Sequence, residues 1–187
     1  MAERPFELAI EIAVLTHGHA TGYLAPAFFA STLHELLEGR SVEAAVAHAR
    51  RSVEEHRQCD EVLVAVDRAA AAATAVRVGA DPRAVVRTLG HGQTADEALQ
   101  IALFCIYVSR GVRDALSLSV AHDGDTDATA SLVGAALGAA GGVTGLPVDW
   151  LAVLELRAEI ETLADDLFRA TRENLERGDW SMKYPGC

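Results

Sequence analysis

The alanine-rich stretch from Val42 to Val78 constrains the fold of this 187-residue chain more than any other feature. It reads VEAAVAHARRSVEEHRQCDEVLVAVDRAAAAATAVRV, and alanine has the highest helix propensity of all residues. Ser41 can cap its start, Gly79 follows its end, and its length predicts a helical region that bends or breaks once. Runs of alternating β-branched residues hardly occur along the chain, so we predict an all-α fold.

Helix signals elsewhere predict the remaining elements. Asp81 precedes a proline at the first helical position, which predicts a short helix ending at Gly90. Thr94 and Glu97 match a capping box, in which each side chain binds the other's backbone amide. The other expected helices cover 6–16, 23–38, 98–109, 112–121, 129–140, a region opening at 147–150, and 158–178.

Two further expectations concern packing. Gly134 and Gly138 lie inside the expected helix at 129–140, where their lack of a side chain would permit close packing against another helix. No linker or internal repeat divides the chain, so we expect residues 1–187 to form a single domain.

Charge and cysteine content restrict the partners and the compartment. The chain has 16 Lys and Arg against 27 Asp and Glu, and its net charge of −11 disfavours direct contact with nucleic acid or an anionic membrane. Cys59, Cys105 and Cys187 are odd in number and far apart, which is typical of a reducing compartment. The chain begins without the layout of a secretory signal, and residues 128–146 are too weakly hydrophobic to span a bilayer. We therefore expect a cytoplasmic protein.

Three carboxylates stand at two-residue spacing before an apolar, small-residue helix: Asp123, Asp125 and Asp127. An EF-hand calcium loop fails here, because Ala128 replaces its turn glycine and Gly134 its bidentate glutamate. What remains is a D-x-D pair, Asp125 and Asp127, whose hard oxygen atoms could bind magnesium or manganese. In the alternative interpretation, Asp127 caps the following helix and the other two are solvated turn residues.

A second group of interest is the segment LTHGHATGY, which contains His17 and His19. Zinc binding is disfavoured, since no further pair of ligands stands at a readable spacing. Gly18 and Gly22 indicate that the chain comes close to a ligand or to another backbone, with an imidazole at a loop-to-helix junction. The alternative is an ordinary, partly buried histidine.

Together these segments resemble one family, the ADP-ribosylglycohydrolases, which includes the dinitrogenase reductase-activating glycohydrolases of bacteria. The resemblance covers essentially the whole chain, and its four segments occur in the family's order. It is carried by LTHGHATGYLAPAFFA (15–30), LGHGQTADEALQIALFC (89–105), HDGDTDATASLVGAALGA (122–139) and PVDWLAVLELRAEIETLADDL (147–167) with the terminal WSMKYPG.

The resemblance implies a compact all-α hydrolase that uses a pair of magnesium or manganese ions. Such an enzyme cleaves the N- or O-glycosidic bond between ADP-ribose and a protein side chain or related acceptor. By position, Asp125 and Asp127 are implied metal ligands. His17 matches the family histidine that contacts ADP-ribose, and Gly18 shares its loop. Gln93 lies where the family places a residue, often apolar or aromatic, against the nucleotide.

Two departures from the family pattern lead to a narrower expectation. Ala128 stands where the family usually has a serine or threonine that also ligates metal. An upstream G-D-x-x-G segment and a T-D-D-T motif, which supply the family's other metal ligands and its catalytic carboxylate, are absent. We therefore expect a carboxyl-terminal, partial domain that is inactive alone and contains no identified catalytic residue. Its segments FELAIEIAVL and SLVGAALGAA should expose apolar faces, and the chain should bind a missing amino-terminal half or self-associate. The alternatives are an inactive ADP-ribose-binding or structural relative and a helical interaction domain.

Overall fold

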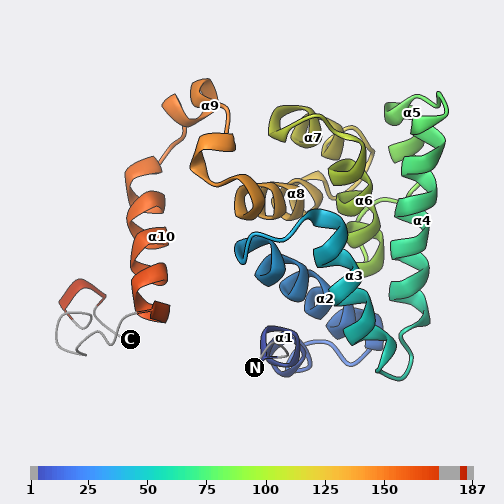
Figure 1. Ribbon diagram of the computed structural model, residues 1–187, viewed down its shortest axis with the longest axis horizontal. Helices are drawn as coiled ribbons and strands as arrows, with labels where there is room; N and C mark the ends of the chain where they lie inside the picture. Colours follow the sequence, from blue (N-terminus) through green and yellow to red (C-terminus); the bar gives the residue numbers. More distant parts are fainter. Residues whose placement is uncertain (1–3, 173–181, 185–187) are drawn as a thin grey trace. The chain divides into compact units, whose positions relative to one another are not determined.

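The computed structural model describes residues 4–172 and 182–184, and every regular element in these ranges is a helix (Figure 1). The predicted all-α fold is confirmed. The chain divides into two compact units, Met1–Leu146 and Pro147–Cys187. The first unit contains α1 (Arg4–Ala13), α2 (Ala20–Leu37), α3 (Val42–Glu54), α4 (Asp60–Arg77), α5 (Pro82–Val86), α6 (Ala95–Val108), α7 (Val112–Ser119), α8 (Thr126–Gly141) and a 3-10 turn η1 (Val143–Gly145). The second contains α9 (Val148–Ala152) and α10 (Arg157–Arg172).

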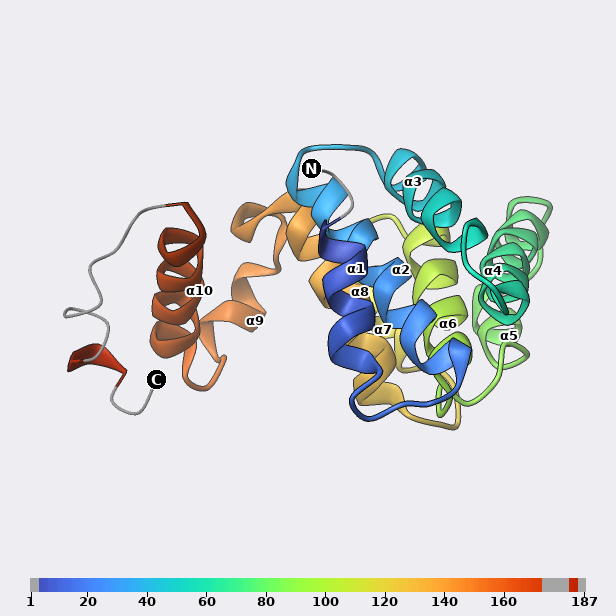
Figure 2. The same cartoon turned by 90° about the horizontal axis from the view of Figure 1, so that it is seen from below.

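Helix α6 is the centre of the first unit. It packs against α2, α4, α7 and α8, and Figures 1 and 2 show it between α2 and α4. Every residue from Ala98 to Ile106 is buried, which agrees with a helix that is apolar on all sides. Leu24 and Phe28 of α2 are fully buried in the same core.

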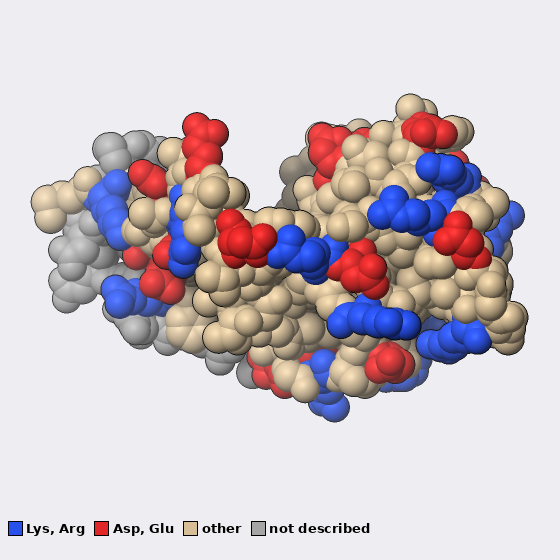
Figure 3. Space-filling view, turned by 90° about the horizontal axis from the view of Figure 1, so that it is seen from above, with Lys and Arg blue, Asp and Glu red and all other residues tan. Residues whose placement is uncertain are grey.

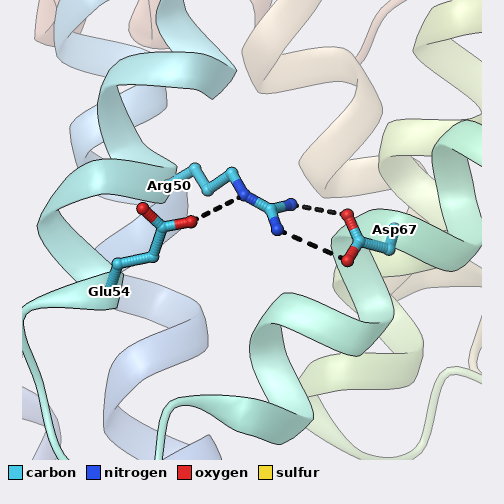
Figure 4. Close-up of polar contacts among 3 residues, drawn as sticks. All are labelled: Arg50, Glu54 and Asp67. Atoms are coloured by element: carbon cyan, nitrogen blue, oxygen red, sulfur yellow. Dashed lines mark hydrogen bonds and ion pairs between the residues drawn. The ribbon is translucent and has the colours of Figure 1, made fainter.

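The predicted break in the alanine-rich region is confirmed between α3 and α4. Gln58 adopts a left-handed conformation there, with φ of 61°. Arg50 joins the two helices: its guanidinium donates to both carboxylate oxygens of Asp67, at 2.5 and 3.4 Å, while its Nε donates to Glu54 at 2.9 Å (Figure 4). The side chain of Arg50 therefore extends across the gap from α3 to α4.

The predicted caps at Ser41 and Asp81 are confirmed, and the predicted capping box at Thr94 is not; Ser41 accepts the amide of Ala44 at 3.3 Å. Asp81 accepts hydrogen bonds from the amides of Arg83 and Ala84, as the Asp-Pro pair predicted. The capping box of Thr94 and Glu97 is wrong, because the side chain of Thr94 makes no cap bond. Glu97 accepts instead from the amide of His91, at 3.1 Å.

The expectation of close packing at the glycines of α8 is also wrong for the described residues. A Cβ atom at Gly134 would make only an ordinary contact, 3.7 Å from Leu116, and one at Gly138 would meet nothing within 4 Å. These glycines are therefore not required by a neighbouring helix in this part of the chain.

An apolar stripe along helix α1 and the turn that follows it is exposed, as predicted. Leu8 and Ile12 of the helix are 49% and 60% exposed and Leu15 of the turn is 80% exposed, while Phe6 is buried. Contiguous exposed apolar surface of this kind is typical of an interaction face. None of the helices described in residues 4–172 and 182–184 is long and apolar enough to cross a membrane.

In the second unit, Asp166 ties the terminal segment to α10. The hydroxyl of Tyr184 donates to its carboxylate at 2.6 Å, and Nζ of Lys183 lies 2.5 Å away. These contacts lower the pKa of Asp166. The predicted helix continues to 178, but residues 173–178 and most of the terminal WSMKYPG lie outside the described residues.

Candidate functional site

The turn before α8 holds the two predicted metal ligands side by side. Asp125 is the N-cap, and its Oδ1 accepts the amide of Ala128 at 3.2 Å. Because the helix begins at Thr126, Asp127 lies in its first turn, which corrects the interpretation of Asp127 as the cap. Asp127 is exposed, and its pKa is lowered by a hydrogen bond shared between its carboxylate and the side chain of Asp125 and by hydrogen bonds that backbone amides donate. Two carboxylates thus stand together at a helix N-terminus, where the helix dipole favours negative charge.

The shape of this turn depends on the loop before α6. The amide of Asp125 donates to the carbonyl of His91 at 2.7 Å, and Nδ1 of His91 lies 3.0 Å from the carbonyl of Asp123. A Cβ atom at Gly124 would lie 1.9 Å from the same His91 carbonyl oxygen. The turn therefore needs glycine because the two backbones touch.

The same contact brings the loop of Gln93 to the acidic turn. Gly92 has φ of 69°, and a Cβ atom there would lie 2.9 Å from Cγ2 of Thr129 in α8. Behind the loop, Nε2 of Gln100 donates to the carbonyl of Leu89. Gln93 follows Gly92 directly and is exposed. The structure thus places two of the predicted site segments next to each other.

The third predicted segment lies elsewhere. The loop between α1 and α2, which carries His17 and Gly18, is separate from the start of α8 in Figure 1. His17 is exposed rather than partly buried, and its Nδ1 lies 2.8 Å from the hydroxyl of Thr16. Its ring rests on Gly22, where a Cβ atom would lie 2.9 Å from Cβ of His17. A Cβ atom at Gly18 would meet nothing within 4 Å.

The donor atoms at the turn suit a hard cation but are few. Among the described residues, no three His, Cys, Asp or Glu side chains come together as a metal-binding group. Asp125 and Asp127 supply carboxylate oxygens, the ligands that magnesium prefers. Ala128 supplies none, and the hydroxyl of Thr129 cannot replace it, because Thr129 is fully buried and its Oγ1 lies 2.9 Å from the carbonyl of Ser119.

Sequence reasoning missed three residues that build this site: His91, His122 and Thr129. His122 is buried, and its Nε2 lies 3.0 Å from Oγ1 of Thr129. A single histidine or threonine gives no local signal for such a role. The glycines at 92 and 124 carried the only readable signal, since both mark close approach.

Two pockets in the first unit lie away from these residues. One is a groove of about 350 Å³ between α3 and α4, floored by Tyr107 and bordered by Arg50. Burial raises the pKa of Tyr107 to about 12. The other, of about 210 Å³, lies beside His48 and His56. Figure 3 shows acidic and basic side chains interspersed on one face, so neither sign dominates among the described residues there.

Comparison with known proteins accounts for the order of these segments. The family model described as ADP-ribosylglycohydrolase matches residues 1–177. The ADP-ribosylhydrolase ARH3 of Danio rerio is 30% identical over 109 residues, which are 51% of this chain and 30% of that protein. The chain therefore spans less than two thirds of the length of this relative. No solved structure matches the chain. The chain belongs to the ADP-ribosylglycohydrolase family.

Proposed function

We propose that this chain is part of a hydrolase that removes ADP-ribose from a modified protein side chain or a related acceptor. The observation that carries the proposal is the pairing of Asp125 and Asp127 in the family's acidic motif, held against the loop of Gln93. Such a site combines oxygen ligands for a cation with a neighbouring polar group for the nucleotide.

Asp125 and Asp127 would hold magnesium or manganese, one or both of the two ions that the family uses. Asp127 is exposed, so its carboxylate is ionised at neutral pH and accessible to a cation, as a metal ligand requires. A divalent ion bound there would polarise oxygen ligands and acidify a bound water. The helix dipole favours negative charge at this turn, and the cap bond of Asp125 fixes its side chain beside Asp127.

Gln93, His17 and Gly18 are the proposed substrate-binding residues. Gln93 has a side-chain amide that can both donate and accept hydrogen bonds, so we expect it to bind a polar edge of the nucleotide rather than to stack on it. His17 is exposed and available to a ligand. Because its loop is separate from the acidic turn, it would contact a different part of ADP-ribose.

We further infer that this chain acts with additional helices, on the same or another polypeptide. Two carboxylates hold magnesium weakly and do not complete a two-ion site. The apolar stripe of Leu8, Ile12 and Leu15 supports a covering element, and the segment matched in the Danio rerio relative is 30% of that protein. The catalytic carboxylate would come from those helices.

The free thiols of Cys59 and Cys105 support a cytoplasmic location.

Manganese titration and a hydrolysis assay test this proposal. Mn²⁺ binding by the 187-residue chain, followed by electron paramagnetic resonance, should be weak and should be lost in Asp127→Asn. Release of ADP-ribose from modified arginine or serine peptides should require the addition of a family-like amino-terminal half. Turnover by the chain alone, abolished by Asp127→Ala, would contradict the inferred need for additional helices. A wild-type chain that binds no Mn²⁺ would contradict the metal role.

A second candidate function is ADP-ribose binding without hydrolysis, as part of an interaction domain. Ala128 favours it, because the family's hydroxyl ligand is absent and the nearby Thr129 is buried. This function predicts ADP-ribose binding that is unchanged by EDTA and no turnover when the amino-terminal half is added. Calorimetry in EDTA and in Mn²⁺ distinguishes the two candidates.

A further inference from the structure

A buried polar pair, His122 and Thr129, lies beneath the acidic turn. His122 is 5% exposed and Thr129 is fully buried, and Nε2 of His122 lies 3.0 Å from Oγ1 of Thr129. The same oxygen lies 2.9 Å from the carbonyl of Ser119, the last residue of α7. The pair therefore joins the end of α7 to the first turns of α8.

The protons of this pair can be assigned from its contacts. A hydroxyl has one proton to donate, and the shortest contact of Thr129 is with the carbonyl of Ser119. Thr129 then accepts from the Nε2–H of His122, which leaves Nδ1 as the bare nitrogen. Nδ1 is buried and has no hydrogen-bond partner among the described residues. An unpaired buried nitrogen is unfavourable, so stability by itself does not explain an imidazole at this position.

The acidic turn and the loop of Gln93 both contact this pair. Oγ1 of Thr129 lies 3.2 Å from the carbonyls of Asp125 and Thr126. On the other side, a Cβ atom at Gly92 would lie 2.9 Å from Cγ2 of Thr129 and 3.7 Å from Cε1 of His122. The pair thus lies beside the contact between the acidic turn and the loop of Gln93, and it touches both segments.

We propose that His122 and Thr129 are positioning residues that fix Asp125 and Asp127 relative to the loop of Gln93. Both side chains are buried, so they act through these backbones and not by contact with substrate. The expected effect on metal binding rests on the proposed function. The positioning of the acidic turn against the loop of Gln93 can be measured without metal.

The first experiment compares two substitutions of Thr129 in the full chain. Thr129→Val keeps the shape and removes the hydroxyl, whereas Thr129→Ser keeps the hydroxyl. In Mn²⁺ titrations we expect Thr129→Val to weaken binding about tenfold, the usual effect of losing a group that orients a metal ligand, and Thr129→Ser to retain the wild-type affinity. Equal affinity in wild type and Thr129→Val would overturn the proposal.

The second experiment measures amide hydrogen exchange without metal. The amide of Asp125 donates to His91 across the contact between turn and loop. It should exchange roughly fivefold faster in Thr129→Val, as expected for the loss of one hydrogen bond, while amides inside α4 keep their wild-type rates. Unchanged exchange at Asp125, or the same acceleration in α4, would overturn the positioning role. If the wild type binds no Mn²⁺, the metal role fails and this measurement still decides the inference.

A substitution of His122 separates positioning from simple stability. His122→Leu removes both the unpaired nitrogen and the bond to Thr129, so a purely structural role predicts that exchange changes equally at Asp125 and inside α4. A positioning role predicts faster exchange at Asp125 with unchanged exchange inside α4. The nitrogen chemical shifts of the His122 ring add a check, since they should show a protonated Nε2 and a bare Nδ1.

Discussion

Replacement of Gly124 by alanine should separate the acidic turn from the loop before α6. The new Cβ atom would lie 1.9 Å from the carbonyl oxygen of His91, whereas an ordinary carbon–oxygen contact is about 3.3 Å. The backbones must therefore move apart by about 1.4 Å. That shift takes the bond from the Asp125 amide to His91, now 2.7 Å, to about 4.1 Å, beyond hydrogen-bond reach.

The expected loss of stability follows from the contacts that this movement breaks. Two hydrogen bonds join the turn and the loop, and each contributes about 0.5–1.5 kcal/mol, so the loss is about 1–3 kcal/mol. The less flexible unfolded chain of the alanine variant offsets up to about 1 kcal/mol of this. With a loss in the middle of that range, about 2 kcal/mol, and an offset of about 1 kcal/mol, the net loss is about 1 kcal/mol, which corresponds to a decrease in Tm of roughly 2–4 °C for a chain of this size.

Thermal unfolding followed by circular dichroism measures this effect, with Gly138→Ala as the matched control. A Cβ atom at Gly138 would meet nothing within 4 Å inside α8, and alanine is favoured over glycine in a helix by about 1 kcal/mol. The control should therefore raise the Tm. A Gly124→Ala variant that melts with the wild type would show that the backbones of the acidic turn and of the loop before α6 do not touch.

Three further predictions concern charge and reactivity. Arg50→Ala removes a network of exposed ion pairs, so it should lower the free energy of unfolding by about 1 kcal/mol in low salt and by less in high salt. Urea unfolding at both ionic strengths measures the two losses. Equal losses would show that the effect of Arg50 on stability is not electrostatic. Burial raises the pKa of Cys105 to about 12, so thiol reagents should modify the half-buried Cys59 first and reach Cys105 only after unfolding, as peptide mass spectrometry would show. Asp127 should titrate below the 3.8 of an unperturbed aspartate in a carboxyl NMR titration. The stability that ionisation of Asp127 contributes is then complete above about pH 4 and is lost as the pH falls through the pKa of Asp127 in the folded state. A measured pKa at or above 3.8 would contradict the contact between Asp127 and the Asp125 side chain.

Local chemistry explains which parts of the fold the sequence could predict. The alanine-rich region formed α3 and α4 because helix propensity is an intrinsic property, and Asp81 capped α5 because its partners are the next few amides. Glu97 was misassigned because its carboxylate turns back to His91, a contact that depends on the left-handed Gly90 between the helices. The capping-box rule considers only the amide of the N-cap residue as a partner for this glutamate, not an amide in the preceding loop.

The position of the acidic pair in the chain was predictable, but the construction of the turn around it was not. The spacing of Asp125 and Asp127 in a known motif made them candidate ligands from sequence. The contact between Gly124 and His91 joins residues far apart in the chain, and no spacing rule predicts it. His122 could not be recognised as part of the site, because a lone histidine acquires its role only when α7 and α8 are placed.

The contact between the two loops also determines whether this acidic motif can be transplanted. Residues 122–129 fused to the start of a designed helix would keep the carboxylates in order along the chain, yet would lack the His91 carbonyl that receives the Asp125 amide. A graft that reproduces the native arrangement must carry residues 90–93 as well, presented from a second helix at the correct distance. For protein engineering, the transferable unit is therefore a pair of loops rather than a peptide.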